Sequence, residues 1–337
     1  VLEAKRTHKL SHRLNIHELP FFGRKQELSQ LEEYLSLVET GEAVGPFLVM
    51  GQSGTGKKRL LRQLVLMSNR SFNFIKVEGK ATSQRYEGSS WNDLRQALEK
   101  LGDEMGISLL EEEDDLISVW NQLQGLSKEK PLLILLENAQ WIDAVSLEKV
   151  KQLEERRNQE KWQLIFTAEE PLPASFVNFL GSLKVEKRLS QLELTNFDPS
   201  ESRALLKGEL GAIEPAVMEQ MVEWSEGSPF LLSSYIEEWK ENENLEPLPD
   251  IIQAYLSQEL GDMSSEEEAL LHYLSCFHKP ISLSILAELT ATELPVLTEL
   301  IEPLSERAIV SIVEEGEALM VQFCKQLVAM YFYHLLS

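Results

Sequence analysis

A glycine-rich loop between an apolar run and a helical pattern constrains the fold of this chain most. The apolar residues 47–50 precede the loop, and the amphipathic residues 59–67 follow it. Glycines let backbone N–H groups wrap around a phosphate, and the N-terminus of the following helix adds a partial positive charge. This order predicts a phosphate-binding loop, in which Lys57 reaches the β- and γ-phosphates of a nucleotide. The predicted cofactor-binding residues here are Gly51, Gln52, Ser53, Gly54, Thr55, Gly56, Lys57, Lys58 and Arg59.

The last position of the loop, Lys58, is unusual for a phosphate-binding loop. Such loops carry Ser or Thr there, and the hydroxyl group binds Mg²⁺. An ammonium group cannot bind a cation, so Lys58 either replaces part of the charge of the metal or points to solvent. The sequence therefore leaves Mg²⁺ binding open. The alternative interpretation of the loop is a glycine-rich turn without a ligand.

Strand and helix patterns alternate from residue 21 to about residue 195. Short apolar runs typical of buried parallel strands are separated by amphipathic helix patterns, which predicts an α/β fold with a parallel sheet. The predicted strands cover residues 46–51, 72–78, 131–137, 162–168 and, as an edge strand, 185–194. We therefore assign residues 21–195 to a P-loop nucleotide-binding core.

The chain changes character on both sides of this core. Residues 1–20 are a polar lead-in and are interpreted as a linker from a preceding domain. Residues 196–245 have helical patterns and predict a helical lid domain. Residues 246–337 predict short helices and then a two-stranded hairpin at 308–313 and 318–323, which is the order of a winged-helix domain.

A second element of a P-loop site follows the apolar run 132–136, which ends at Glu137 and Asn138. Phosphoryl transfer needs groups that hold the metal and orient the attacking water, and acidic residues at the end of a buried strand supply them. Glu137 takes the metal-orienting position. Asn138 stands where a carboxylate base is expected, and because an amide cannot accept the proton of water, general-base catalysis is lost there. Both are therefore interpreted as catalytic positions of a degenerate site.

Several motifs in the expected order resemble those of STAND ATPases, the signalling modules of the AAA+ type. The similar segments are residues 22–24, 51–58, 137–143, 226–230 and 323–327. The resemblance covers about residues 20–337 and rests on several motifs, so it is more specific than a single loop. It implies a regulatory module of a multidomain signalling protein that binds ATP or ADP. It also implies two further nucleotide-binding residues, Arg24 and Pro229, the latter against the adenine.

Departures from the family pattern gather around the nucleotide. Lys58 and Asn138 replace a hydroxyl and a carboxylate, and residues 167–169 lack the arginine that the family usually places after this strand. Lys325 replaces a histidine at the end of the winged helix. Together these changes predict a nucleotide-dependent conformational switch in which hydrolysis is weak or absent.

The net charge of −23 over 337 residues excludes some partners. So many acidic groups repel phosphate, which argues against nucleic acid and anionic membranes as partners. No apolar run approaches the roughly 18 residues that cross a bilayer, so we expect a soluble, cytoplasmic protein. Cys276 and Cys324 lie among apolar residues without a metal-ligand spacing, so we expect buried free thiols and no metal-ligating cluster.

The preferred function is an ATP- or ADP-binding switch that controls other domains of the same protein or a protein partner. The alternative is a scaffold that has lost nucleotide binding and acts as an adaptor. A DNA-binding regulator is disfavoured, because residues 246–337 hold fifteen acidic residues against the basic Lys279, Arg307 and Lys325. The sequence is compatible with oligomerisation, and it leaves the stimulus, the output domain and the choice between adenine and guanine open.

Overall fold

The computed structural model describes residues 19–42, 44–82, 84, 86–107, 115–128, 130–157, 160–185, 189–245, 248–277, 279–315 and 318–336. These residues form two compact units, one of Pro20–Asn196 and a second that contains Phe197–Ser337. The predicted linker over residues 1–20 lies outside the described residues except for its last two. The predicted start of the winged-helix domain, residue 246, also lies outside them.

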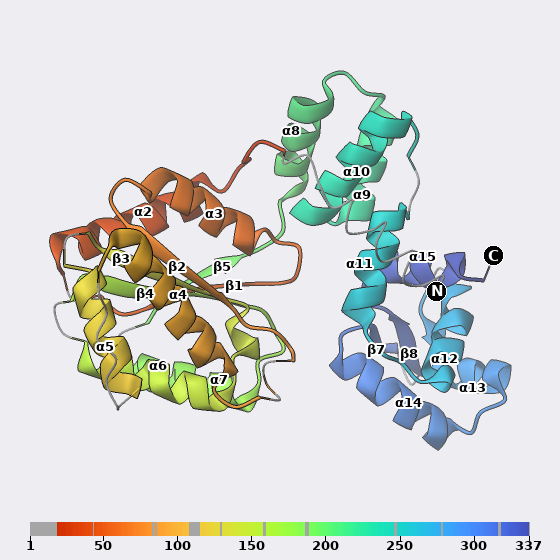
Figure 1. Ribbon diagram of the computed structural model, residues 1–337. Coiled ribbons are helices and arrows are strands. Elements are labelled where there is room, and N and C mark those ends of the chain that lie inside the picture. The colour runs from red at the N-terminus through yellow and green to blue at the C-terminus, as the bar shows by residue number, and fades with distance from the viewer. Residues whose placement is uncertain are drawn as a thin grey trace, which may run out of the picture. The chain divides into compact units, whose positions relative to one another are not determined.

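The first unit is built on a five-stranded parallel sheet (Figure 1). Its strands are β1 (Phe47–Gly51), β2 (Asn73–Glu78), β3 (Leu132–Glu137), β4 (Trp162–Ala168) and β5 (Ser190–Leu194). They lie in the order β2-β3-β4-β1-β5, so the strand that carries the glycine loop has a neighbour on each side. All five strands lie within the runs predicted from the sequence, and β5 is the predicted edge strand.

Helices cover both faces of the sheet (Figure 1). One face is covered by α2 (Lys25–Thr40) and α3 (Lys57–Ser68). The other face is covered by α4 (Ser89–Met105), α5 (Asp115–Leu126), α6 (Ala144–Arg156) and α7 (Ala174–Val185). Successive strand residues point to opposite faces, so Val49 packs with α2 and α3 while Leu48 packs with the other helices. Burial on both faces explains why the strands are continuous apolar runs.

The second unit begins with the helices α8 (Pro199–Leu210), α9 (Pro215–Ser225) and α10 (Pro229–Asn242), which pack against one another. Each begins with a proline. Proline fits the first helical position because a backbone N–H group at that position has no acceptor within the helix, so its absence costs nothing. Asp198 caps α8 by accepting hydrogen bonds from the backbone N–H groups of Ser200 and Glu201. This segment is helical, as predicted for residues 196–245.

The rest of the second unit contains further helices and a small antiparallel sheet. The elements are α11 (Asp250–Leu260), α12 (Ser265–Ser275), β6 (Ile281–Ser282), α13 (Leu283–Thr290), α14 (Leu294–Glu306), β7 (Val310–Glu315), β8 (Ala318–Phe323) and α15 (Gln326–His334). The predicted hairpin is formed by β7 and β8, with Val310 opposite Phe323. The sheet has a third strand, β6, which pairs with β8. The prediction of a two-stranded sheet was therefore incomplete, because two residues are too few to show a period.

Further sequence expectations concern membrane-spanning segments, metal ligands and the two cysteines. In the described part of the chain, no helix is long and apolar enough to cross a membrane, and no group of three or more His, Cys, Asp and Glu side chains could hold a metal. Cys276 and Cys324 are free thiols, but both are exposed, so their predicted burial was wrong. The reason is local: Cys276 lies just beyond α12, where Leu274 and Ser275 are the residues that face inward.

Candidate nucleotide site

The glycine loop leaves β1 at the carboxyl edge of the sheet, and its conformation requires its glycines. Gly54 and Gly56 have φ angles of 79° and 94°, in the region that glycine adopts without a steric cost. A Cβ atom on Gly51 would lie 2.6 Å from the carbonyl oxygen of Leu194 in β5. Only glycine allows the two backbones to approach so closely. The loop and the first turn of α3 therefore have the strand–loop–helix arrangement that the sequence predicts.

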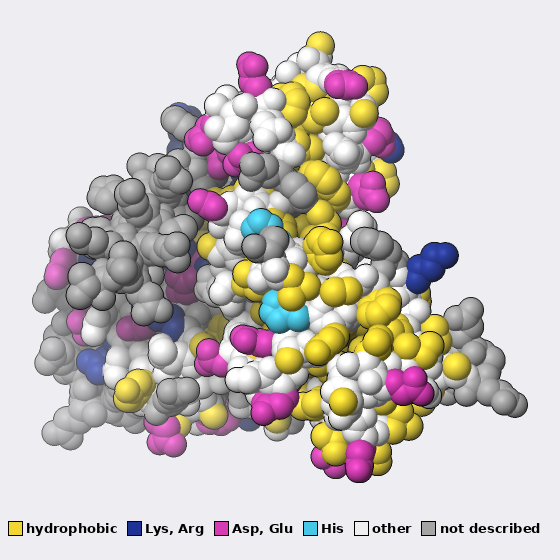
Figure 2. Space-filling view, turned by 90° about the vertical axis from the view of Figure 1, so that its right-hand side faces the viewer, with side chains coloured by type: hydrophobic (Ala, Val, Ile, Leu, Met, Phe, Trp, Pro, Cys, Tyr) yellow, Lys and Arg dark blue, Asp and Glu magenta, His cyan; other side chains and the backbone are white. Residues whose placement is uncertain are grey.

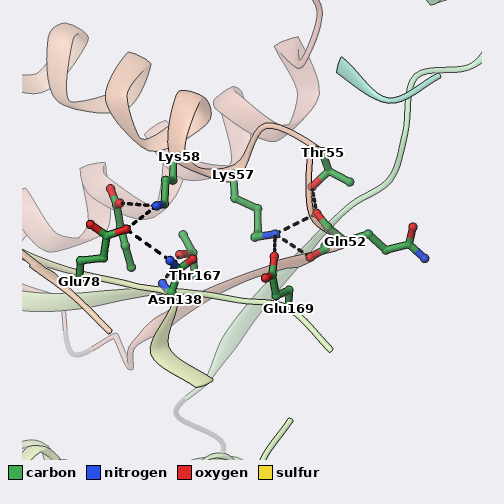
Figure 3. Close-up of polar contacts among 10 residues, drawn as sticks. Gln52, Thr55, Lys57, Lys58, Glu78, Asn138, Thr167 and Glu169 are labelled. Atoms are coloured by element: carbon green, nitrogen blue, oxygen red, sulfur yellow. Dashed lines mark hydrogen bonds and ion pairs between the residues drawn. The ribbon is translucent and has the colours of Figure 1, made fainter. Parts of the chain in front are cut away.

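Lys57 begins α3 and points back over the loop (Figure 3). Its side chain is only 6% exposed. The ammonium group donates to the carbonyl oxygens of Gly51 at 2.7 Å and Gln52 at 2.9 Å, and to Glu169 Oε2 at 3.0 Å. The predicted phosphate-binding lysine is thus buried, and it is held in place by the loop and by one carboxylate.

Lys58, by contrast, is the last residue of the loop, and its side chain is half exposed (Figure 3). Its ammonium group forms an ion pair with Glu78 and lies 4.0 Å from Glu137 Oε2. These two carboxylates are neighbours because Glu78 and Glu137 are register partners at the ends of β2 and β3. The hydrogen bond from Lys58 is the main cause that lowers the pKa of Glu78. Lys58 therefore does not simply point to solvent, and its replacement of part of the charge of the metal stays a prediction.

Glu137 is the acidic end of β3, and it is 5% exposed. Its Oε2 atom also lies 2.8 Å from the ammonium group of Lys76 on β2. The predicted metal-orienting residue thus already has two lysines, Lys58 and Lys76, within ion-pair distance.

Asn138 follows Glu137 in a left-handed backbone conformation, with φ 51° and ψ 47°, which asparagine tolerates better than most residues. Its backbone N–H donates to Thr167 Oγ1 at 3.0 Å, and its side-chain amide donates to Glu78 Oε1 at 3.4 Å. The two predicted catalytic positions therefore lie beside the loop, and the amide is turned toward the same carboxylate that binds Lys58 (Figure 3).

Arg24 precedes α2, and its guanidinium group contacts both the glycine loop and the chain that follows β5. It donates to the carbonyl oxygen of Thr55 at 3.3 Å and to that of Thr195, and it forms an ion pair with Glu27 at 2.9 Å. It thus ties the glycine loop to the chain that leaves β5. Its predicted contact with nucleotide remains a prediction, and so do those of Gln52 and Ser53, which are exposed on the loop, and of Arg59 in α3.

Pro229 belongs to the second unit, where it is the first residue of α10. The preceding Gly227 has a φ of 73°, and a Cβ atom there would lie 2.0 Å from the carbonyl oxygen of Phe197. The segment that resembles a family motif therefore has a structural role of its own, because it packs the start of α10 against the start of the unit. The contact of Pro229 with adenine remains a prediction.

Sequence reasoning missed three acidic residues that the structure gives specific contacts: Glu78, Glu169 and Asp143. Glu78 and Glu169 follow or end parallel strands at the edge that carries the loop, and this shared position was the signal that could have found them. Asp143 lies within a recognised motif and caps α6, where Oδ1 accepts from the backbone of Gly88 at 2.8 Å and of Ser146 at 2.9 Å. It holds the loop before α4 to the start of α6.

Comparisons with known proteins show a family match and a shared fold. Residues 20–166 match the family model of the AAA ATPase domain. No curated protein matches the chain. The recognition of an AAA-type ATPase from its motifs is confirmed for this segment.

Solved structures also resemble the chain. A Walker-type ATPase of Pyrococcus abyssi is 19% identical, with a TM-score of 0.64 over 93% of this chain and 96% of its own. The ORC2 protein of Aeropyrum pernix, solved in ADPNP–ADP complexes, is 15% identical, with a TM-score of 0.59 over 95% and 98%. A STAND protein with a tetratricopeptide repeat sensor from Pyrococcus horikoshii is 16% identical, with a TM-score of 0.41 over 94% of this chain and 42% of its own. The first two similarities confirm the fold class: a parallel α/β P-loop core, a helical domain and a winged helix.

Proposed function

Because residues 20–166 match the family model of the AAA ATPase domain, we propose that the chain binds ATP or ADP at residues 51–58 and serves as a regulatory switch with slow or absent hydrolysis. The observation that carries the proposal is the buried ammonium group of Lys57 above a loop whose glycines are conformationally required. Such a loop presents backbone N–H groups and one cation to the phosphates. A solved structure of the same fold holds ADPNP and ADP.

The residues around the loop do not fit the Mg²⁺ ion that P-loop ATPases use. The hydroxyl ligand is replaced by Lys58, and the ammonium group lies against Glu78 and Glu137, the acids that remain near that position. A cation already fills the electrostatic role there, and an ammonium group cannot be a ligand. Without a bridging metal and without a carboxylate at Asn138, charge development and proton removal during hydrolysis lack their usual support.

The chain further acts in signal transduction as a STAND-type module. A ligand shifts a conformational equilibrium only if it binds one state better than another. A nucleotide that is bound and not consumed suits such a switch, because its occupancy persists until the concentration changes. The controlled element would be another domain of the same protein or a protein partner in the cytoplasm.

The alternative function is an adaptor that binds no nucleotide, and the changes at Lys58 and Asn138 favour it. Calorimetric titration of the purified chain with ADP and with ATP tests both. We expect binding, and we expect Lys57→Ala to weaken it at least about tenfold, because a charge-assisted phosphate contact is worth about 1.5–3 kcal/mol. Mass spectrometry of the purified protein tests independently whether a nucleotide is carried through purification.

Lys100→Ala is the matched control, since Lys100 is an exposed lysine whose ion pair is with Glu104 of the same helix, α4. It should bind like the wild type. Lack of binding by the wild type, or equal binding by the wild type and Lys57→Ala, would favour the adaptor.

A further inference from the structure

Glu169 lies beside the glycine loop although it is far from it in the sequence. It directly follows β4, which is paired with β1 so that Ala168 is opposite Met50. Residue 169 therefore comes next to Gly51, where the loop begins. Its Oε2 atom lies 3.0 Å from the ammonium nitrogen of Lys57, and its side chain is 29% exposed (Figure 3).

The contacts of Lys57 leave no proton for a phosphate. An ammonium group has three donors, and the three acceptors are the carbonyl oxygens of Gly51 and Gln52 and the carboxylate of Glu169. The two carbonyl oxygens belong to the loop backbone, whereas Glu169 is a side chain that can rotate away. A phosphate that binds Lys57 therefore has to share it with Glu169 or displace it.

Glu169 differs from the other acids around the loop in its cationic partners. Glu78 is paired with Lys58, and Glu137 is paired with both Lys58 and Lys76. Within the part of the chain that the structure describes, Glu169 has an ion pair only with Lys57. When a phosphate takes Lys57, Glu169 loses its partner and faces the phosphate as a like charge, which is unfavourable.

We propose that Glu169 is a specificity-determining residue that makes the site favour ADP over ATP. The proposal rests on the nucleotide binding proposed above. The lysine of a P-loop reaches the β- and γ-phosphates, so the carboxylate beside it lies at the end of the phosphate chain. ATP places one more phosphate near this carboxylate than ADP does. Repulsion by Glu169 therefore weakens ATP binding more than ADP binding, and the site keeps the diphosphate form.

The test is calorimetric titration of the wild type and of Glu169→Gln with ADP and with ATP, in a buffer without divalent cations. Glutamine keeps the shape and an oxygen that accepts from Lys57, but it removes the negative charge. We expect the wild type to prefer ADP, and the variant to shift the ratio of the two dissociation constants toward ATP by about fivefold or more. Glu170→Gln is the matched control, because it removes an exposed charge one residue further along. It should leave the ratio unchanged within about twofold.

Each outcome is decisive. Binding by the wild type with the same ratio in Glu169→Gln overturns the inference and leaves the proposed function standing. An equal shift in Glu170→Gln also overturns it, because the effect would then be one of net charge alone. Nucleotide binding that appears only in Glu169→Gln supports the inference and shows that the carboxylate of Glu169 prevents nucleotide binding in the wild type. Absence of binding in all three proteins overturns the proposed function together with the inference.

Discussion

The ammonium group of Lys58 forms an ion pair with the carboxylate of Glu78, on the side of the loop where a P-loop ATPase binds its metal. This contact joins the first turn of α3 to the end of β2. The negative charge of Glu78 at this edge of the sheet is therefore balanced without a divalent cation.

Nucleotide binding by the wild type is therefore expected to depend weakly on Mg²⁺, and steady-state hydrolysis is expected to be very slow or absent. Combining Lys58→Thr with Asn138→Asp restores a hydroxyl ligand and a carboxylate base. This variant should bind nucleotide in a more Mg²⁺-dependent way or show Mg²⁺-dependent phosphate release. Titration with and without Mg²⁺ and a phosphate-release assay measure both.

Lys57→Ala serves as the control for contaminating ATPases in this assay. Brisk phosphate release by the wild type that Lys57→Ala abolishes would contradict the interpretation of the site as degenerate.

Asp143 is expected to stabilise the core in a pH-dependent way. Burial raises the pKa of its carboxyl group, but hydrogen bonds from Ser146, Gly88 and Ser90 outweigh this and lower the pKa from the ordinary 3.8. Because the folded-state pKa is below the unfolded one, the stabilisation is complete above about pH 4 and is lost as the pH falls through the folded-state pKa.

Asp143→Asn should lower the free energy of unfolding near neutral pH by about 2 kcal/mol, because its amide N–H groups face backbone donors. Thermal melts from neutral to acidic pH should show the gap between the wild type and this variant closing below about pH 4. Asp103→Asn, an exposed change on α4, is the control and should follow the wild type throughout. A gap that stays constant down to the most acidic sample would refute the ionic origin of the effect.

Gly51 should tolerate no side chain. Its Cβ atom would lie 2.6 Å from the carbonyl oxygen of Leu194, so Gly51→Ala forces β1 and β5 apart and should cost about 1–3 kcal/mol of stability. Gly125 in α5 has open space around a Cβ atom, and Gly125→Ala should gain up to about 1 kcal/mol, since alanine favours a helix. The unfolding midpoint of the core in urea distinguishes them. Equal midpoints would mean that the two strands separate without cost.

The winged helix is expected not to bind duplex DNA at about 150 mM salt. Its region holds fifteen acidic residues against three basic ones, so phosphate-neutralising side chains are scarce. Figure 2 shows acidic side chains scattered over the described part of the face that it presents, and few Lys or Arg side chains there. A gel-shift assay with random duplex is sufficient, and retention at micromolar protein would contradict the prediction.

The sequence by itself determined the local elements of this protein. The run 47–50, the glycines at 51, 54 and 56, and the strand that ends at Glu137 were recognisable because a buried parallel strand and a phosphate loop are encoded by residues close to one another in the chain. The hairpin of β7 and β8 was recognisable for the same reason, as an alternation interrupted by a turn.

The tertiary structure alone decided which of these elements meet. The order β2-β3-β4-β1-β5 places Glu169 beside Lys57 and Glu78 beside Lys58, although 112 and 20 residues separate the pairs along the chain. A local pattern can place Glu78 and Glu169 at the ends of parallel strands, but it does not give the strand order that decides which lysine each carboxylate meets. The exposure of Cys276 and the short strand β6 were missed for a related reason. Burial and pairing are properties of the neighbours that folding brings together, not of the residues adjacent in sequence.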